Sequence, residues 1–134
     1  MKVVDTNIVV YLLLDGTYSE AARALFAADS DWHSETFLMV EIVNVLATSM
    51  RVAKRPFAET LQTLADARHL MASGLRSVDD RDVLDAAAHF GVSGYDARFL
   101  VVARAFGERL VTEDARLRDK APDLTCSIAE ALAG

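Results

Sequence analysis

Four acidic residues of this sequence stand where solubility alone does not explain them. Glu41 lies in the middle of the apolar run 37–46 and has no cation within one helical turn of it. An ionised carboxylate in a dry interior is costly unless it takes up a proton or finds cations and hydrogen bonds. The other three acids each lie next to an apolar segment: Asp5, Asp96 and Asp114. The partner of Glu41 must come from a remote part of the chain or from solution.

The expected positions of these acids bring them to one pocket. Asp5 and Asp114 each follow a predicted strand, and open parallel sheets bind ligands at the C-terminal ends of their strands. Asp96 lies in the first turn of a predicted helix, and Glu41 lies about one turn into another. Two like charges ~4 Å apart repel by about 4 kcal/mol at an effective dielectric of roughly 20, so the cluster requires bound cations or raised pKa values. Oxygen ligands without soft donors favour Mg²⁺ or Mn²⁺.

Each acid also has a simpler explanation. Asp5 and Asp114 could cap the helices that follow them, and Asp96 could interact favourably with a helix dipole. Glu41 has no capping role, so a functional role is favoured there. Four neighbours could support the site, two as hydroxyl donors and two as outer acids, although spacing does not require any of them: Thr6, Thr112, Glu113 and Asp119.

The elements that must position these residues alternate along the chain. Strands are expected near residues 2–5, 32–33, 75–78, 109–112 and 124–126. Helices are expected at about residues 6–14, 19–26, 37–51, 56–72, 79–90, 94–105, 115–120 and from 127 onward. The alternation predicts a Rossmann-like α/β fold, with a parallel sheet of about four or five strands covered by helices on both faces. No linker or repeat divides the chain, so one domain over residues 1–134 is expected.

Local signals predict where the helices begin and end. Thr6 and Asn7 offer caps for the first helix, and residues 34–36 are expected to cap the central one. The central helix should run to about Arg51 and be buried, because the run 37–46 is apolar on every helical face. Proline is favoured in a first helical turn, so Pro56 is expected to begin the next helix.

Composition limits the possible classes of function. The chain has 134 residues, of which 52% are hydrophobic and 25% are charged, which is typical of a globular protein. Its formal net charge of −6 argues, taken alone, against nucleic-acid binding. Bound divalent ions are absent from that count, however, so acids gathered to hold metal would produce the same value.

Other residues argue against alternative chemistries and locations. The single cysteine, Cys126, lies in an apolar segment and is expected to be a buried thiol rather than a nucleophile. The three histidines stand alone, without zinc-site spacing. No apolar run approaches the ~20 residues of a membrane span, and the N-terminal segment 1–5 carries a charge where a signal peptide would keep its apolar centre. A cytoplasmic protein is therefore expected.

The acids and the residues around them resemble those of the PIN-domain nucleases. The matching motifs are Asp5-Thr6-Asn7 after the first strand, Glu41 in an apolar helix, Tyr95-Asp96-Ala97 at a helix start and Leu110-Val111-Thr112-Glu113-Asp114 after a late strand. Length and motif order are most similar to the VapC toxins of VapBC toxin-antitoxin pairs. The resemblance covers nearly the whole chain and implies a PIN-like fold.

The resemblance also implies a function. It makes Asp5, Glu41, Asp96 and Asp114 the acidic metal ligands and catalytic centre, with Thr112 as a supporting hydroxyl and Asn7 beside the site. The implied activity is Mg²⁺- or Mn²⁺-dependent cleavage of single-stranded RNA, commonly tRNA or ribosomal RNA. Members of this group usually form homodimers. Each is inhibited by a cognate VapB-type antitoxin, whose C-terminal segment occupies the pocket.

Contacts to RNA must come from local basic groups, since the net charge is negative. The candidates are Arg51, Lys54 and Arg55 after the central helix, and Arg98 two residues past Asp96. Each could also be an ordinary solvated cation.

Three alternative functions remain. A phospho-acceptor receiver domain would require paired acids after the first strand and a lysine after the last, and this chain has neither. A phosphatase of the haloacid dehalogenase type would require an aspartate at position 7, where this chain has Asn7. A PIN-like binding module without catalysis is disfavoured by the intact acids.

Overall fold

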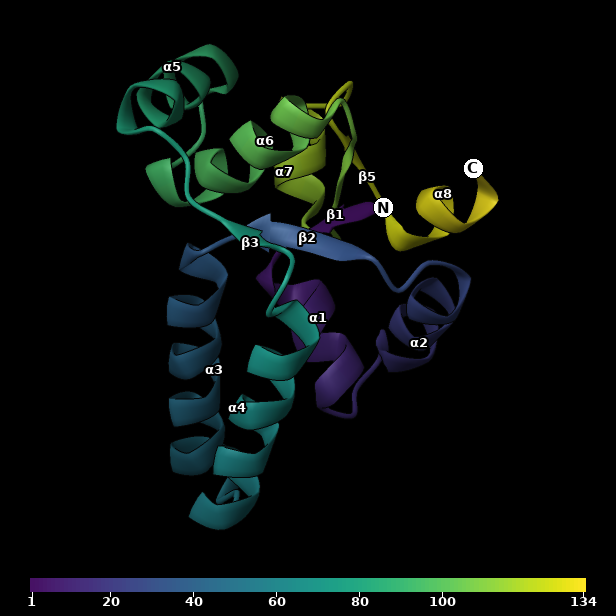
Figure 1. Ribbon diagram of the computed structural model, residues 1–134, viewed down its shortest axis with the longest axis vertical. Coiled ribbons are helices and arrows are strands. Elements are labelled where there is room, and N and C mark those ends of the chain that lie inside the picture. The colour runs from purple at the N-terminus through teal and green to yellow at the C-terminus, as the bar shows by residue number, and fades with distance from the viewer.

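The computed structural model describes residues 1–134 and contains five short strands and eight helices (Figure 1). In chain order they are β1 (Lys2–Val4), α1 (Thr6–Leu13), α2 (Ser19–Ala28), β2 (Trp32–Glu35), α3 (Phe37–Ala53), α4 (Phe57–Met71), β3 (Leu75–Arg76), α5 (Asp80–Phe90), α6 (Gly94–Phe106), β4 (Leu110–Val111), α7 (Ala115–Lys120), β5 (Thr125–Cys126) and α8 (Ile128–Ala133). All the elements expected from the sequence are present, with small shifts at their ends.

The strands form one parallel sheet in the order β3-β2-β1-β4-β5. Helices α5 and α6 lie on one side of the sheet, and α1, α3 and α4 lie on the other (Figure 1). The predicted α/β fold, a parallel sheet with helices on both faces, is therefore confirmed. The strand order reverses between β1 and β4, and such a switch point is where open α/β sheets bind ligands.

The strand order also bears on the receiver alternative. Receiver domains have the flavodoxin-like order 2-1-3-4-5, in which the third strand lies next to the first. Here β2 and β4 flank β1, and β3 is an edge strand. The topology therefore argues against a receiver domain.

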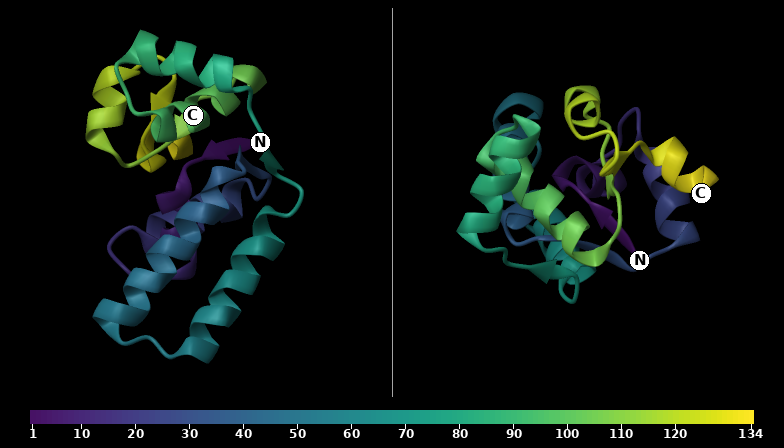
Figure 2. Two further views of the ribbon diagram at one scale, coloured as in Figure 1. Left: turned by 90° about the vertical axis from the view of Figure 1, so that its left-hand side faces the viewer. Right: turned by 90° about the horizontal axis from the view of Figure 1, so that it is seen from above.

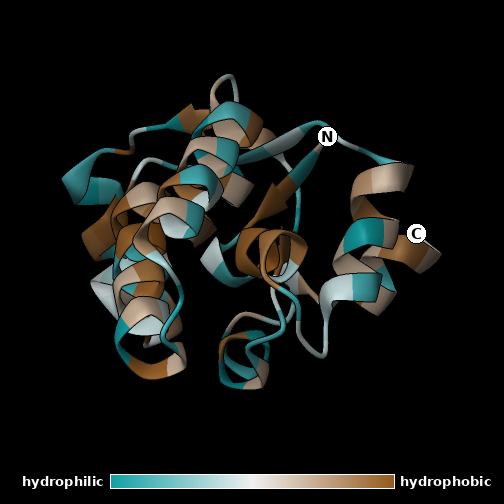
Figure 3. Cartoon of the chain, turned by 90° about the horizontal axis from the view of Figure 1, so that it is seen from below, coloured by the Kyte–Doolittle hydropathy of each residue, from teal (hydrophilic) through white to brown (hydrophobic).

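The core is built around the two central strands. The side chains of Val3 and Val4 in β1 and of Leu110 in β4 are fully buried, and Val111 is nearly so. In Figure 3 the strand that begins at the N-terminus is hydrophobic, whereas the longer helices carry both hydrophobic and hydrophilic residues. Val4 pairs with Val111, and this register places side by side the residues that directly follow the two strands, Asp5 and Thr112. Packing of the central strands thus fixes the position of one of the acids.

Some helix caps differ from those expected. Asp5, rather than Thr6 or Asn7, caps α1, because its side chain accepts a hydrogen bond from the backbone N–H of Ile8. Residues 34 and 35 belong to β2, and Thr36 makes no side-chain cap hydrogen bond. Pro56 precedes the first residue of α4 instead of beginning that helix.

The prediction that α3 is buried on every face was wrong. Leu38, Ile42 and Leu46 are buried, but the side chains of Val40 and Val43 are 60% and 47% exposed. Helix α3 packs against α1 and α4 along one stripe. The α3–α4 pair extends away from the sheet, so nothing in this chain covers its outer face (Figure 2). The hydrophobic composition of a helix does not show whether other elements cover both of its faces.

No helix of this structure combines the length and the apolar character that crossing a membrane requires.

Candidate active site

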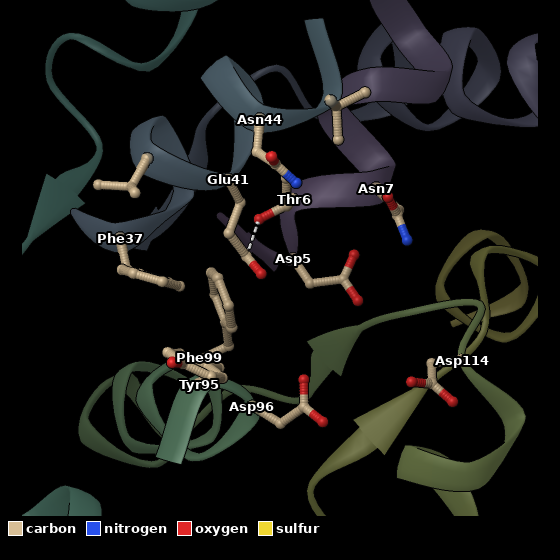
Figure 4. Close-up of a pocket in the computed structure, with 12 residues that line it drawn as sticks. Asp5, Thr6, Asn7, Phe37, Glu41, Asn44, Tyr95, Asp96, Phe99 and Asp114 are labelled. Atoms are coloured by element: carbon tan, nitrogen blue, oxygen red, sulfur yellow. Dashed lines mark hydrogen bonds between the residues drawn. The ribbon is translucent and has the colours of Figure 1, made fainter. Parts of the chain in front are cut away.

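The four predicted acids line one open pocket beside the switch point of the sheet (Figure 4). Asp5 follows β1, Glu41 lies in α3, Asp96 lies in the first turn of α6, and Asp114 precedes α7. The pocket has a volume of about 490 Å³. Eight other residues complete its lining: Thr6, Asn7, Phe37, Val40, Asn44, Val45, Tyr95 and Phe99. Four segments remote in sequence therefore place a carboxylate around one cavity.

Asp5 is the most strongly perturbed of the four acids. The pKa of Asp5 is raised from 3.8 to about 7, chiefly by burial and to a smaller extent by the nearby charges of Glu41 and Asp96. Hydrogen bonds from the Thr112 hydroxyl and the Ile8 backbone N–H act in the opposite direction on this pKa but do not offset the burial. The Asp5 carboxylate is therefore held in a place that penalises its charge.

Glu41 is half-buried and accepts a hydrogen bond from the Thr6 hydroxyl, which is shown as the dashed line in Figure 4. Its partner is thus a neutral donor that lies 35 positions earlier in the chain. Burial raises the pKa of Glu41, as does the charge of Asp96, whereas the Thr6 hydrogen bond lowers it. The hydrogen bond holds Oε1 of Glu41 in position but does not balance the charge of the carboxylate.

Asp96 and Asp114 stand at the starts of two helices. Ser93 caps α6 by accepting from the backbone N–H of Asp96. Burial raises the pKa of Asp96, and the charge of Asp114 raises it further. Asp114 caps α7, because its Oδ1 accepts from the backbone N–H groups of Arg116 and Leu117 at 3.0 and 3.2 Å. The capping roles considered for Asp5 and Asp114 are therefore real, and both residues still line the pocket.

None of the four acids forms an ion pair with a lysine, arginine or histidine. Their pocket therefore concentrates negative charge with only neutral hydrogen-bond donors to balance it. The set of carboxylate oxygens fits a hard divalent cation such as Mg²⁺ or Mn²⁺. In this structure no three acid, histidine or cysteine side chains are close enough together to form a ligand group. Side-chain rotation would have to bring the carboxylates together around an ion.

The charge cluster predicts how the stability of the ion-free protein depends on pH. Because the folded state raises the pKa of Asp5 from 3.8 to about 7, it binds the proton more tightly than the unfolded chain does. The resulting stabilisation is fully present below pH 3.8 and is lost as the pH rises through about 7. In EDTA, the melting temperature should fall between about pH 5 and about pH 8.

Asp5→Asn is the matched variant for this prediction, because the amide does not titrate. The fall in melting temperature over the same pH range should be smaller for the variant than for the parent by roughly 5 °C or more. Identical pH profiles for the two proteins would contradict the elevated pKa of Asp5.

The other sequence-predicted residues lie in different places. Asn7 and Thr6 line the pocket, and Thr112 is fully buried behind Asp5. The backbone N–H of Asp114 donates to the Thr112 hydroxyl, so one threonine contacts two of the acid-bearing segments. Glu113 does not line the pocket; its carboxylate accepts from the backbone N–H of Ile128 instead. Asp119 is exposed and also lies outside the lining: the pocket therefore includes neither acid that the sequence left open.

None of the four candidate RNA-contacting cations lines the pocket. Arg51 lies in the last turn of α3 and Lys54 directly follows that helix, at the end of the α3–α4 pair away from the sheet (Figures 1 and 2). Arg55 donates to the Ser49 hydroxyl in the same connection. Arg98 forms an ion pair with the buried Glu35 at 3.4 Å. Each of these cations therefore lies away from the pocket or is held by another group, and none contacts the acids directly.

Two groups of residues near the acids escaped the sequence analysis. Asn44 lies three positions after Glu41, so helical spacing could have placed both on one face. Arg116 and Lys120 line a second pocket, of about 210 Å³, which also includes Asp96 and Asp114. Arg116 follows Asp114 by two residues, but sequence spacing gave no sign that α7 turns its cations toward the acids.

The chain was compared with families, curated proteins and solved structures. The PIN domain family model matches residues 2–122. The fold is similar to the crystal structure of PAE2754 from Pyrobaculum aerophilum, with a TM-score of 0.72 and 21% sequence identity over 98% of this chain and 93% of that one. No curated protein gives a significant match. At 21% identity the structural likeness shows the fold, whereas the family model covers most of the chain. This chain belongs to the PIN domain family.

Proposed function

We propose that this protein is a Mg²⁺- or Mn²⁺-dependent endoribonuclease that cleaves single-stranded RNA. The observation that carries the proposal is the meeting of Asp5, Glu41, Asp96 and Asp114 in one open pocket without any basic partner. Structural carboxylates in such a place would be paired or replaced, because their mutual repulsion destabilises the fold. Nuclease activity is also general among PIN domains.

The residues of the pocket would act by fixing the positions of their carboxylate oxygens and by the negative electrostatic potential that these oxygens create. A divalent ion held by the carboxylates would supply a nucleophilic water at neutral pH and stabilise negative charge on the phosphate. The residues that would hold that ion are Asp5, Glu41, Asp96 and Asp114. Thr6 holds the Glu41 carboxylate, and Thr112 holds Asp5 and the backbone before α7. The chain's contribution is to fix oxygen atoms in an arrangement that solvent does not provide.

The RNA backbone would pass over the second pocket. Arg116 and Lys120 are exposed, and they line a cavity that shares Asp96 and Asp114 with the first. Lys120 donates to the backbone carbonyl of Gly91 at 2.8 Å, which holds its ammonium group at the rim. Cations at this place can neutralise phosphates next to the scissile one, although the net charge of the chain is −6.

We further propose that the nuclease domain comprises residues 1–134 and acts as a VapC-type toxin. The length and motif order of the chain support this proposal, as does an apolar groove between α3 and α4 that includes Val43, Phe57 and Leu61. These three side chains are 47%, 65% and 48% exposed, and exposed apolar groups of this size favour protein contacts. A VapB-type antitoxin and a second copy of the chain are the partners that the resemblance implies.

Purified protein should degrade single-stranded RNA in the presence of Mn²⁺ or Mg²⁺, and EDTA should abolish the degradation. The reason is that no lysine, arginine or histidine lines the pocket, so a divalent ion would have to activate water and balance the phosphate charge. Fluorescently labelled RNA resolved on a denaturing gel gives the measurement. Adding excess Mn²⁺ after EDTA should restore cleavage. The same RNA annealed into a duplex is the control for strand preference.

Two results would contradict the proposal. Cleavage that persists in EDTA would mean metal-independent chemistry or a contaminating ribonuclease. Binding of RNA without cleavage in any divalent ion would favour the catalytically silent binding module.

A further inference from the structure

We propose that Tyr95 is a stacking platform that binds an unpaired nucleobase of the substrate beside the acidic pocket. This inference rests on the proposed ribonuclease function and assigns a binding subsite to it. Tyr95 lines the same pocket as the four acids and directly precedes Asp96 in α6. Its side chain is nevertheless 62% exposed, which is unusual for an aromatic ring at the rim of a polar cavity.

A second aromatic ring supports Tyr95 from the other side of the sheet. Phe37, the first residue of α3, stacks on Tyr95 with the ring centroids 5.2 Å apart and the planes 13° from parallel. In Figure 4, Phe37, Tyr95 and Phe99 gather on one side of the pocket, and Asn7 and Asp114 lie on the other. The pocket therefore has an apolar, aromatic wall and a polar wall.

The support ring is itself held in place by a buried network. The guanidinium of Arg98 lies 5.6 Å from the centroid of the Phe37 ring, and it pairs with Glu35 at 3.4 Å. The Glu35 carboxylate, which is 1% exposed, also accepts from the backbone N–H of Phe37. Both the backbone and the ring of Phe37 thus depend on one fixed carboxylate. A preorganised ring loses little freedom when a ligand stacks on it.

A nucleobase is the ligand that fits these observations best. Every base has a flat π-face, so stacking on tyrosine tolerates any sequence. Paired bases are already stacked within a duplex, and only an unpaired base can leave its neighbours to reach a protein ring. A base bound at Tyr95 would place its phosphate near the acids, because Tyr95 and Asp96 are adjacent. The subsite would therefore select single-stranded RNA and hold it beside the acidic pocket.

Tryptophan fluorescence gives a direct test of stacking. The only tryptophan of the chain, Trp32, is 3% exposed and lies in the core, so it should respond little to RNA. Tyr95→Trp is made in the Asp5→Asn background, in which RNA should bind without being cut. Titration with a single-stranded oligoribonucleotide should quench the new fluorescence saturably. The same sequence as a duplex should give little quenching, and Asp5→Asn alone should give little in either case.

Kinetics give an independent test. Tyr95→Ala should raise KM about tenfold, whereas kcat should stay within about twofold, because stacking holds the substrate and does not touch the reacting bond. Tyr95→Phe keeps the ring and should behave like the parent. Tyr18→Ala is the matched control, since Tyr18 is 40% exposed, packs against the tilted ring of Tyr11 and does not line the pocket.

Substrates with one abasic nucleotide, scanned along the strand, identify the bound base. At one position the abasic substrate should lose about tenfold in kcat/KM with the parent, and Tyr95→Ala should cause no further loss with that substrate. If the parent cleaves RNA but the abasic substrates show no such coupling and the Tyr95→Trp protein shows no quenching, the platform is overturned and the nuclease proposal stands. Quenching without cleavage by the parent supports the platform and rejects the nuclease. Absence of both rejects the two together.

Discussion

Asp96→Asn should reduce the rate of RNA cleavage by roughly 10³-fold or more while leaving the protein folded. Asparagine has nearly the same shape as aspartate but carries no charge, so it weakens the hold on a divalent ion and removes one of four negative charges. The same loss is expected for Asp5→Asn. Initial cleavage rates at saturating Mn²⁺ give the measurement, and melting temperatures show that the variants are folded.

Asp82→Asn is the matched control for this prediction. Asp82, like Asp96, is an acid in the first turn of a helix, but it lies in α5, is exposed and does not line the pocket. The control should retain the parental rate. Equal rates for Asp96→Asn and the parent would place the active site elsewhere in the protein.

Variants that remove one of these carboxylates should lose activity but gain stability in the absence of metal. Burial raises the pKa values of Asp5, Glu41 and Asp96, so each of these carboxylates destabilises the folded state when it is ionised. Removing one such charge should therefore stabilise the ion-free protein at neutral or higher pH even as it abolishes cleavage. A structural carboxylate would show the reverse, since its loss would lower stability and leave the chemistry unchanged.

Sequence reasoning worked best where one local signal decides the structure. Asp5 and Asp114 follow short apolar strands, and the strands of a parallel sheet end at a common edge, so their meeting could be foreseen. Glu41 stood out because no local partner explained it. The structure supplies a partner that is remote in sequence, the Thr6 hydroxyl, and no cation.

Sequence reasoning failed where the answer depends on how elements pack. The run 37–46 predicted full burial, yet Val40 and Val43 are exposed because only one stripe of α3 meets α1 and α4. Arg116 lies near the acids because α7 follows Asp114 at an angle that no spacing rule gives. Glu35 could not be identified either, because its partner Arg98 lies 63 positions away.

The buried Glu35 gives the second large prediction. Arg98→Ala should lower the free energy of unfolding by roughly 3 kcal/mol or more, because it leaves a buried carboxylate without its only cation. The Glu35 side chain is 1% exposed and that of Arg98 is 31% exposed, so water cannot easily replace the guanidinium. Urea unfolding followed by circular dichroism gives the measurement.

Arg104→Ala provides the matched control on the same helix. Arg104 pairs with Asp85 at 3.8 Å, but the two side chains are 44% and 74% exposed, so the loss should be less than about 1 kcal/mol. Equal losses for the two arginine variants would show that burial of Glu35 does not set the strength of its pair.

Adding Glu35→Gln to Arg98→Ala should recover part of the lost stability. A neutral amide needs no cation, and its oxygen can still accept from the backbone N–H of Phe37 as the carboxylate does. The double variant therefore separates the cost of an unpaired charge from the loss of Arg98 packing against the Phe37 ring. If the double variant regains stability but has a higher KM for RNA than the parent, Arg98 supports the aromatic wall of the pocket through its packing. If it regains stability and has the parental KM, the charge of Glu35 alone requires the arginine.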